Sequence, residues 1–405
     1  MSLAENKKLP FYSFIPFLIS ISFASFLNQL ARTIYPPLTP QICGDLNLCH
    51  TDTGNLFFIL SLGFAITLFL SQFISTIITH RVTVLISIFS TGLALALNAC
   101  VYSFVTFKVT IFFVGLCSGF FIPSAVAMIR DFVATEHMGK AFGVFATSQS
   151  FAFIFGPATI KYLNDVYTWK QILCGFGLTS SLIGVLLYTI SKQGDFKGDV
   201  VDRRFISAVF SWPSFWILLV LLCVANGLNI GIYNMAPDYF QRHNLLSKQE
   251  VYNLVVAARA VSIFVAIAAG FIADKFGLKK SMAIAFTVCG AFTMLIGLIN
   301  PYYSLIFFSL QTPVAVCIMP LIHYAISTIV PPERNASIVS IIAPFGFLMG
   351  AGVIPQLLGF FGDLNIYPLG FILFGLSSIL SGLVLYVPTI YKHVEYSQLK
   401  SSSSI

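Results

Sequence analysis

Charged residues are scarce in this sequence, and they are almost absent from its long apolar runs. The chain holds 22 Lys and Arg and 15 Asp and Glu among 405 residues, or 9% of the total. A soluble globular protein carries about 25% charged residues. Together with 57% hydrophobic residues and a mean hydropathy of +0.89, this scarcity excludes an ordinary soluble protein and indicates an integral membrane protein.

Motifs for catalysis and for cofactors are missing as well. The eight cysteines include no CxxC pair, and the sequence shows no zinc signature, no nucleotide-binding loop and no grouping of nucleophile and base. We therefore expect no enzyme activity, no cofactor and no metal site. The net charge of +7 does not indicate a nucleic-acid partner, because membrane topology and anionic headgroups account for basic loops.

Apolar runs of about 20 residues are long enough to cross the hydrocarbon core as helices. The first run is too long for a signal-peptide core and no small-residue cleavage site follows it, so we expect it to be retained. We predict an all-α membrane protein. Its twelve transmembrane helices are predicted near 11–35, 54–78, 82–103, 106–129, 141–163, 170–190, 213–236, 251–273, 281–300, 303–330, 336–361 and 366–388.

The distribution of Lys and Arg predicts the orientation in the membrane. If the N-terminus is inside, 15 of the 22 basic residues fall in inside segments, five fall in outside segments or at their edges, and two lie within spans. The positive-inside rule then places both termini in the cytoplasm. We expect a multi-pass protein of a bacterial inner (plasma) membrane.

The chain divides into two halves that resemble each other weakly. The longest predicted inside loop, 191–212, is polar and separates six spans from six, and segment 123–157 matches 320–355 with a proline at each end. Two related six-helix halves are the plan of a secondary transporter whose site lies between them. The expected domains are 1–190 (first half), 191–212 (linker), 213–390 (second half) and 391–405 (polar tail).

The segment GFIADKFGLKK at 270–280 resembles the G-x-L-A-D-r-x-G-r-k loop signature of the major facilitator superfamily almost position for position. The corresponding first-half loop departs from the signature, with Ser75 in place of the glycine and Thr79 in place of the acidic residue. The resemblance covers about residues 10–390. It implies two pseudo-symmetric six-helix bundles that move a solute by alternating access, and it is closest to the organic-anion, organophosphate and monocarboxylate branches.

The signature also implies a conformational latch. In the superfamily its acidic residue binds the N-terminus of a helix in the other half, where the helix dipole favours a carboxylate; here that helix would begin near Lys140. The alternative is a solvated loop charge. The latch residues implied by the resemblance are Gly270, Asp274, Gly277, Lys279 and Lys280.

Arg32 and Arg259 are the two charged residues inside the predicted spans. An Arg at the centre of a bilayer costs roughly 2.5–3.5 kcal/mol, and its planar fork of donors matches a carboxylate or a phosphate. We therefore predict that both bind a small organic anion. The alternative for Arg32 is a side chain that reaches water at the helix end, and for Arg259 it is a structural pair with another helix.

Both arginines occupy places where anion-binding members of the superfamily carry one. Arg32 lies eight residues before Pro40, as in the organophosphate and anion–cation symporter branches, and an Arg in the eighth span is similar to the monocarboxylate and oxalate carriers. Ile111 stands where organic-anion branches often carry an Arg early in the fourth span, so the role of that residue does not transfer.

Polar residues on the same helix faces are further candidates for the substrate site. The match between the halves aligns Arg32 with Asn229 and Arg259 with Phe64, so the cations are not duplicated by symmetry. Each polar candidate could instead form hydrogen bonds between helices. The candidates are Asn28, Tyr35, Gln149, Asn226, Asn229 and Tyr233.

Proton coupling would need a titratable group inside the membrane. Because no Asp or Glu falls well inside a predicted span, His323 in the tenth span is the candidate for a coupling proton, with hydrogen-bonded packing as the alternative. Uniport, anion exchange and coupling through the substrate's own protonation stay open. Cys43 and Cys49 share a predicted outside loop, where either a disulfide or two free thiols would fit.

The sequence thus predicts a monomeric transporter of a small carboxylate- or phosphate-bearing anion, with a coupling ion or counter-anion as a further partner. One alternative is a carrier of amino acids or short peptides, in which one Arg binds the carboxylate. Another is a membrane receptor on the same fold that binds its ligand without transporting it. A drug exporter is disfavoured because cationic drugs would require an embedded carboxylate.

Overall fold

The computed structural model describes residues 10–191, 193–198, 210–211, 213–242, 248–329 and 332–386, and within them every regular element is a helix. The elements of the first half are η1 (Phe11–Phe14), α2 (Ile15–Thr33), α3 (Tyr35–Leu46), α4 (His50–Ile74), α5 (His80–Ala96), η2 (Leu97–Cys100), α6 (Phe104–Ser118), α7 (Phe121–Phe132), η3 (Thr135–His137), α8 (Met138–Leu163) and α9 (Trp169–Ile190). Those of the second half are α11 (Pro213–Asn226), η4 (Gly227–Gly231), α12 (Ile232–Arg242), α13 (Lys248–Phe276), α14 (Leu278–Leu298), α15 (Pro301–Ile329), α16 (Pro332–Phe347), η5 (Leu348–Val353), α17 (Ile354–Asp363) and α18 (Tyr367–Val384).

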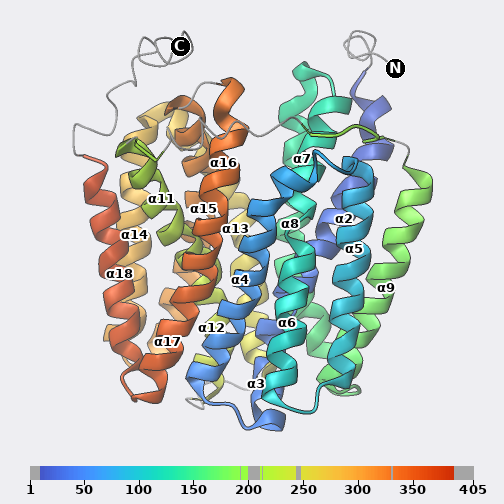
Figure 1. The fold of residues 1–405 in the computed structure, drawn as a ribbon. Helices are drawn as coiled ribbons and strands as arrows, with labels where there is room; N and C mark the ends of the chain where they lie inside the picture. The colour runs from blue at the N-terminus through green and yellow to red at the C-terminus, as the bar shows by residue number, and fades with distance from the viewer. Residues whose placement is uncertain are drawn as a thin grey trace.

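The predicted all-α fold with twelve spans is confirmed. Among the described residues, twelve helical segments are long and apolar enough to cross a membrane. Figure 1 shows them side by side, with α2 beginning and α18 finishing at the same end of the bundle. We call this the terminal end, and the opposite end, where α3 meets α4, the far end.

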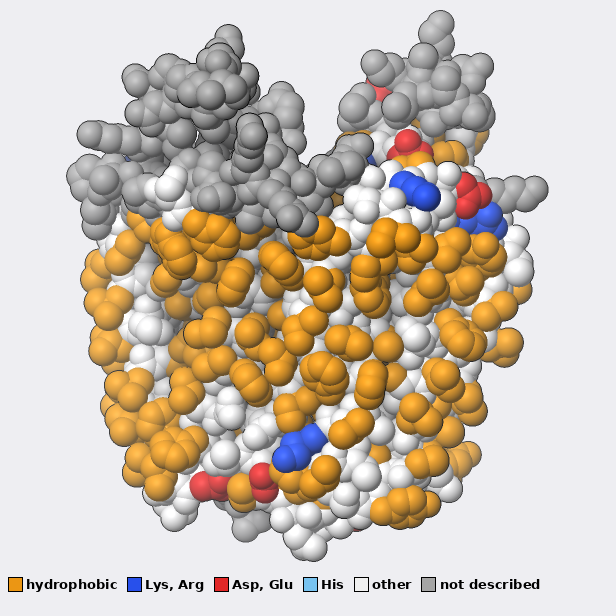
Figure 2. Space-filling model, in the orientation of Figure 1, with side chains coloured by type: hydrophobic (Ala, Val, Ile, Leu, Met, Phe, Trp, Pro, Cys, Tyr) orange, Lys and Arg blue, Asp and Glu red, His pale blue; other side chains and the backbone are white. Residues whose placement is uncertain are grey.

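The outer surface of the bundle is apolar, as a protein surrounded by hydrocarbon requires. Figure 2 shows hydrophobic side chains over most of the visible face, with the charged ones gathered toward the two ends. Large side chains such as Leu182 and Phe264 are 72% and 74% exposed in the isolated chain. This band is the surface that meets lipid.

Glycines allow the closest contacts between helices within each half. A Cβ at Gly290 of α14 would lie 2.6 Å from the carbonyl oxygen of Gly375 of α18, and the reverse distance is also 2.6 Å. In the first half, a Cβ at Gly92 of α5 would lie 2.5 Å from the carbonyl oxygen of Gly177 of α9. Small residues stabilise such pairs because lipid provides no hydrophobic drive between helices.

Two spans contain π-helical turns that meet inside the bundle. In the seventh span α11 passes through η4 into α12, and in the eleventh α16 passes through η5 into α17. A Cβ at Gly231 would lie 2.6 Å from the carbonyl oxygen of Gly350, and one at Gly350 would lie 2.5 Å from the amide nitrogen of Gly227. Single π-turns occur frequently at functional sites, so this crossing marks a region of interest.

At the far end the two halves are in direct contact. A Cβ at Gly54 of α4 would lie 2.5 Å from the carbonyl oxygen of Pro355 in α17. The Tyr252 hydroxyl of α13 donates to the carbonyl oxygen of Pro37 in α3 at 2.8 Å, and the Lys161 ammonium of α8 donates to the Asn253 side chain at 2.9 Å. These contacts close the far end.

A carboxylate near the end of the seventh span is more deeply covered than the sequence predicted. Asp238 of α12 is completely buried, and the seventh span runs to Gln241 where the sequence predicted an end near 236. The misjudgement has a simple cause, because α12 is polar enough to resemble a helix edge although its polar side chains are covered by other helices.

We expect Gly290→Ala to lower the free energy of unfolding by roughly 1–3 kcal/mol, because the added methyl group forces α14 and α18 apart. Thermal unfolding of the purified protein in detergent measures the change. Gly175→Ala in α9 is the matched control, since a Cβ there meets no atom within 4 Å. Equal melting points for the two variants would contradict the packing described for this helix pair.

Candidate functional site

A cavity of about 290 Å³ lies between helices of the two halves. Its walls come from α8 of the first half and from η4, α13 and α15 of the second, and among the described lining residues Arg259 is the charged one. The lining residues are Gly143, Ala146, Thr147, Ser150, Phe153, Asn229, Arg259, Ser262, Ile263, Ala266 and Val316.

Arg259 is buried, with 5% of its surface exposed, and it is surrounded by neutral groups. Its guanidinium donates from Nη1 to Oδ1 of Asn229 at 2.6 Å and from Nη2 to the Asn229 carbonyl oxygen at 2.5 Å. The guanidinium carbon lies 4.4 Å from the ring centroid of Phe153 and 4.5 Å from that of Tyr233. Its Nε has no hydrogen-bond partner within the described residues.

The cavity exists because small residues line two facing helices. On α8 they recur with helical spacing at Gly143, Ala146, Thr147 and Ser150, and on α13 Ser262 lies one turn beyond Arg259. The sequence analysis did not single out this stripe, nor Phe153. Small residues spaced i, i+3 or i+4 along a helix could have indicated this stripe. The same spacing is also typical of ordinary packing between membrane helices, so it does not distinguish a cavity wall.

Arg32 lies in a different environment from Arg259 and does not line this cavity. Its Nη2 donates to Oε1 of Gln29 at 2.5 Å. The guanidinium carbon lies 4.1 Å from the ring centroid of Phe64 in α4 and 5.9 Å from that of Phe347 in α16. Its Nε also lacks a hydrogen-bond partner within the described part of the chain. Both guanidiniums thus have a buried N–H without a partner there, but they lie at different places in the bundle.

The alignment of the two halves relates the surroundings of Arg32 to those of Arg259. Arg32 matches Asn229 and Phe64 matches Arg259 in that alignment, and both pairs are in contact: Arg32 with Phe64 at 4.1 Å and Asn229 with Arg259 at 2.6 Å. Equivalent positions therefore meet in each half, but the cation lies on the first helix of one half and on the second helix of the other.

Of the other predicted binding residues on the first and seventh spans, one contacts Arg259 and the rest make hydrogen bonds elsewhere. Tyr233 joins Arg259, with its ring 5.2 Å from that of Phe153. Asn28 donates to the Ser118 carbonyl oxygen at 3.2 Å, Tyr35 accepts from Asn98 at 3.3 Å and Asn226 donates to the Leu222 carbonyl oxygen at 3.0 Å. These three make hydrogen bonds within their own half, and they do not line the cavity.

Gln149 and His323 also lie outside the cavity lining. Gln149 is half-buried on α8. His323 is exposed on α15, with its Nδ1 2.8 Å from the carbonyl oxygen of Met319 one turn earlier. That local contact resembles packing on a helix surface more than a buried proton relay.

The structure describes only some of the predicted latch residues. Gly277 links α13 to α14 with φ of 89°, a left-handed conformation that favours glycine, and the Lys279 ammonium lies 5.5 Å from the ring centroid of Tyr386. Lys280 is exposed. The side chain of Asp274 and its surroundings at Gly270 lie outside the described residues.

No disulfide joins Cys43 and Cys49, and their sulfur atoms have separate partners. The Cys43 sulfur lies 3.0 Å from the Thr53 hydroxyl, whereas the Cys49 sulfur accepts from the Asp52 backbone N–H at 3.4 Å and caps α4. Burial raises the pKa of the Cys49 thiol to about 11, so it is protonated at neutral pH.

Comparison with known proteins identifies the family to which the sequence is related. The family model of the Major Facilitator Superfamily matches residues 21–343 and 226–402. The chain is similar to an uncharacterised MFS-type transporter of Bacillus subtilis (strain 168), YuxJ, with 23% identity over 202 residues that cover 47% of this chain and 52% of that protein. A second such protein of the same organism, YwfA, is 36% identical over 56 residues, 14% of each chain. The matched region thus spans about half of YuxJ.

Solved transporter structures share the architecture. A bacterial homologue of the human lysosomal transporter Spinster, in an inward-facing and unoccupied conformation, gives a TM-score of 0.74 at 13% identity over 94% of this chain and 96% of that chain. A D-xylose–proton symporter gives 0.74 at 14% identity over 92% and 97%, and the nucleoside transporter NupG 0.75 at 11% over 91% and 98%. With the family match extending over most of the sequence and twelve spans in this arrangement, the chain belongs to the major facilitator superfamily of membrane transporters.

Proposed function

We propose that the protein transports a small organic anion, bearing a carboxylate or a phosphate, by alternating access, and that Arg259 is its principal anion-binding residue. The observation that carries this proposal is a buried guanidinium at the wall of an inter-half cavity, where its partners among the described residues are all neutral. The two ion pairs found among the described residues, His50–Asp238 and Arg81–Asp195, involve neither intramembrane arginine.

The free energy of a buried guanidinium favours an anionic ligand. A buried charge is costly unless it is paired. The rings of Phe153 and Tyr233 and the two Asn229 oxygens lower that cost, but they supply no negative charge. A carboxylate or phosphate oxygen pair matches the guanidinium fork and would replace both oxygens of Asn229. Asn229 therefore holds the guanidinium at the two N–H groups that a substrate carboxylate or phosphate would bind, which is its stand-in role.

The cavity walls favour a compact anion. Its volume of about 290 Å³ is at the lower end of the range for small-molecule sites, roughly 300–1,000 Å³. The hydroxyls of Thr147, Ser150 and Ser262 offer a few hydrogen bonds, and Phe153, Ile263 and Val316 offer apolar contact. A short anion with a small apolar body fits this lining better than a polyhydroxylated solute does.

Arg32 is proposed as a second anion contact, used at another stage of the cycle. It carries the same buried Nε without a partner within the described residues, but its environment is the Phe64–Phe347 ring pair, with centroids 4.9 Å apart. These rings come from different halves, so relative motion of the halves would uncover the guanidinium.

We further propose that the terminal end faces the cytoplasm and that the structure is inward-facing. The excess of Lys and Arg in the terminal-end segments supports the first point. The contacts of Tyr252 with Pro37 and of Lys161 with Asn253, which close the far end, support the second. The proposed location is the bacterial inner membrane.

We expect Arg259→Lys to reduce anion transport at least tenfold while the protein still folds, because lysine keeps the charge but loses the bidentate fork. Initial uptake rates in proteoliposomes and melting points of the purified variants separate the two effects. Arg130→Lys, at an exposed position on α7, is the control for the same exchange of cations. Wild-type uptake by the Arg259→Lys variant would remove Arg259 from the site.

We expect Asn229→Asp to weaken anion binding at least tenfold, because its carboxylate would form a permanent ion pair with Arg259 and compete with the substrate. Asn229→Ala is the matched control, which removes the side-chain acceptor without adding charge and should bind the anion at least as tightly as wild type. Isothermal titration of the purified proteins measures both affinities. Equal affinities of the Asp and Ala variants would argue against the stand-in role of Asn229.

Counterflow in proteoliposomes tests the function as a whole. Vesicles loaded with one anion should accumulate the same labelled anion, whereas a receptor would bind it without exchange. A panel of monocarboxylates, organophosphates, amino acids, short peptides and neutral sugars distinguishes the anion carrier from a zwitterion carrier. Exchange of sugars alone, unaffected by Arg259→Gln, would overturn the proposal.

A further inference from the structure

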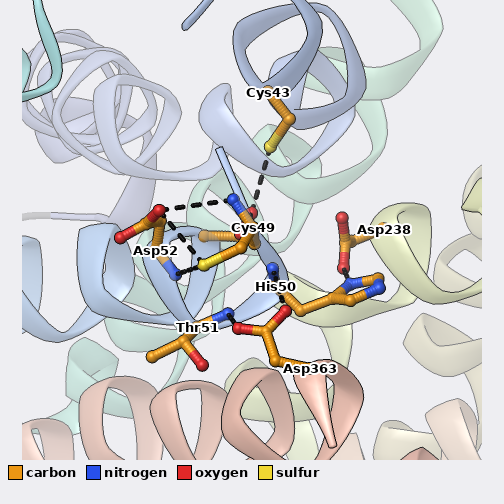
Figure 3. Close-up of polar contacts among 8 residues, drawn as sticks. Cys43, Cys49, His50, Thr51, Asp52, Asp238 and Asp363 are labelled. Carbon is orange, nitrogen blue, oxygen red and sulfur yellow. Dashed lines mark hydrogen bonds and ion pairs between the residues drawn. The ribbon is translucent and has the colours of Figure 1, made fainter. Parts of the chain in front are cut away.

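A cluster of polar contacts joins the two halves at the far end (Figure 3). The His50 imidazole at the start of α4 points at the carboxylate of Asp238 in α12, with Nδ1 2.5 Å from Oδ2. The backbone N–H groups of His50 and Thr51 each donate to the carboxylate of Asp363 at the end of α17, at 2.8 Å. The first turn of α4 is therefore attached to two helices of the other half.

The His50–Asp238 contact is shielded from water. Asp238 is fully buried and the His50 side chain is 16% exposed, while the ring of Tyr367 in α18 meets the imidazole edge-on at 5.3 Å. A buried carboxylate is stabilised by a positively charged partner. The imidazole provides that charge only when it carries its second proton, so the strength of this contact depends on proton binding.

We propose that His50 and Asp238 form a proton-binding lock: a proton bound at His50 stabilises the state in which the far end is closed, and its loss favours opening there. The proposal rests on the alternating-access part of the proposed function, since the lock joins opposite halves. It is independent of which solute is transported and of Arg259.

The sign of the effect follows from which state binds the proton more tightly. In the closed state the Asp238 carboxylate lies beside the imidazole and attracts a proton bound there. When the far end opens, the two groups separate and this attraction is lost. Protons therefore stabilise the closed state, and this stabilisation is lost as the pH rises. For a single proton the ratio of closed to open molecules changes by at most about tenfold per pH unit.

Other titratable groups lie near the lock. They are Cys49 and Asp52 at the start of α4, Asp363 on α17, Tyr239 on α12 and Tyr367 on α18. Arg242 and His243 follow Asp238 in the sequence, and their side chains lie outside the described residues. Substitution of His50 itself therefore decides the assignment.

Distance measurements between the two halves test the lock without any transported solute. Spin labels at Gly44→Cys, where a Cβ meets nothing within 4 Å, and at Leu364→Cys, which is 52% exposed, report the far-end separation. The labelled protein, with its eight native cysteines replaced, is placed in lipid nanodiscs. Pulsed electron resonance then gives the closed and open populations from pH 5.5 to 8.5.

We expect the closed population of the otherwise native protein to fall several-fold as the pH rises through this range, and His50→Gln to abolish that dependence. Asp363→Asn is the matched control: it removes a neighbouring charge, so the closed population should fall at every pH while the pH dependence persists. His323→Gln should also keep the dependence. If His50→Gln does not fold, Asp238→Asn provides the same test, because it removes the carboxylate that holds the proton.

Populations that do not change with pH in the native sequence would overturn the proposal. So would a pH dependence that survives in both His50→Gln and Asp238→Asn, or one that disappears in His323→Gln. Because no solute is present, failure here leaves the anion proposal intact, and failure of the anion proposal leaves this result intact.

Discussion

The central constraint on this structure is a positive charge, Arg259, that is buried without an ion-pair partner among the described residues. Arg259 is held by two oxygens of Asn229 and two aromatic rings, all of them neutral. A guanidinium in such a place costs several kcal/mol relative to water, and a stability argument alone gives no reason to keep it. Under the proposed function the cavity in front of Arg259 gives that reason, because a bound anion would recover much of the cost.

The seventh span connects this charge to the far end. The same helix carries Asn229 and Tyr233 against Arg259 and, less than three turns later, Asp238 against His50. The π-helical turn η4 (Gly227–Gly231) lies at its centre and packs on η5 of the eleventh span. The proposed anion site and the proposed lock therefore lie on the same helical span, which is interrupted between them by an irregular turn.

Much of the fold was predictable from the sequence, and less of the site. Bilayer thickness fixes the length of an apolar helix, so twelve spans could be read from hydropathy, and Gly277 could be read from its signature. Helix-face spacing could not show which helices oppose one another. It grouped Arg32 with Arg259 although Phe64 and Phe347 surround the former. Nor could it show that Asp238, near an apparent span edge, is fully covered.

The central claim, that a buried guanidinium selects an anion, is tested most directly by a pair of ligands that differ only in charge. A short branched monocarboxylate and its primary amide have nearly the same shape, and their binding to the purified protein can be compared by thermal stabilisation. The account predicts that the carboxylate raises the melting point of the native protein and that the amide does not. It also predicts that Arg259→Gln abolishes the difference. Equal stabilisation by both ligands, or an undiminished preference for the carboxylate in Arg259→Gln, would contradict it.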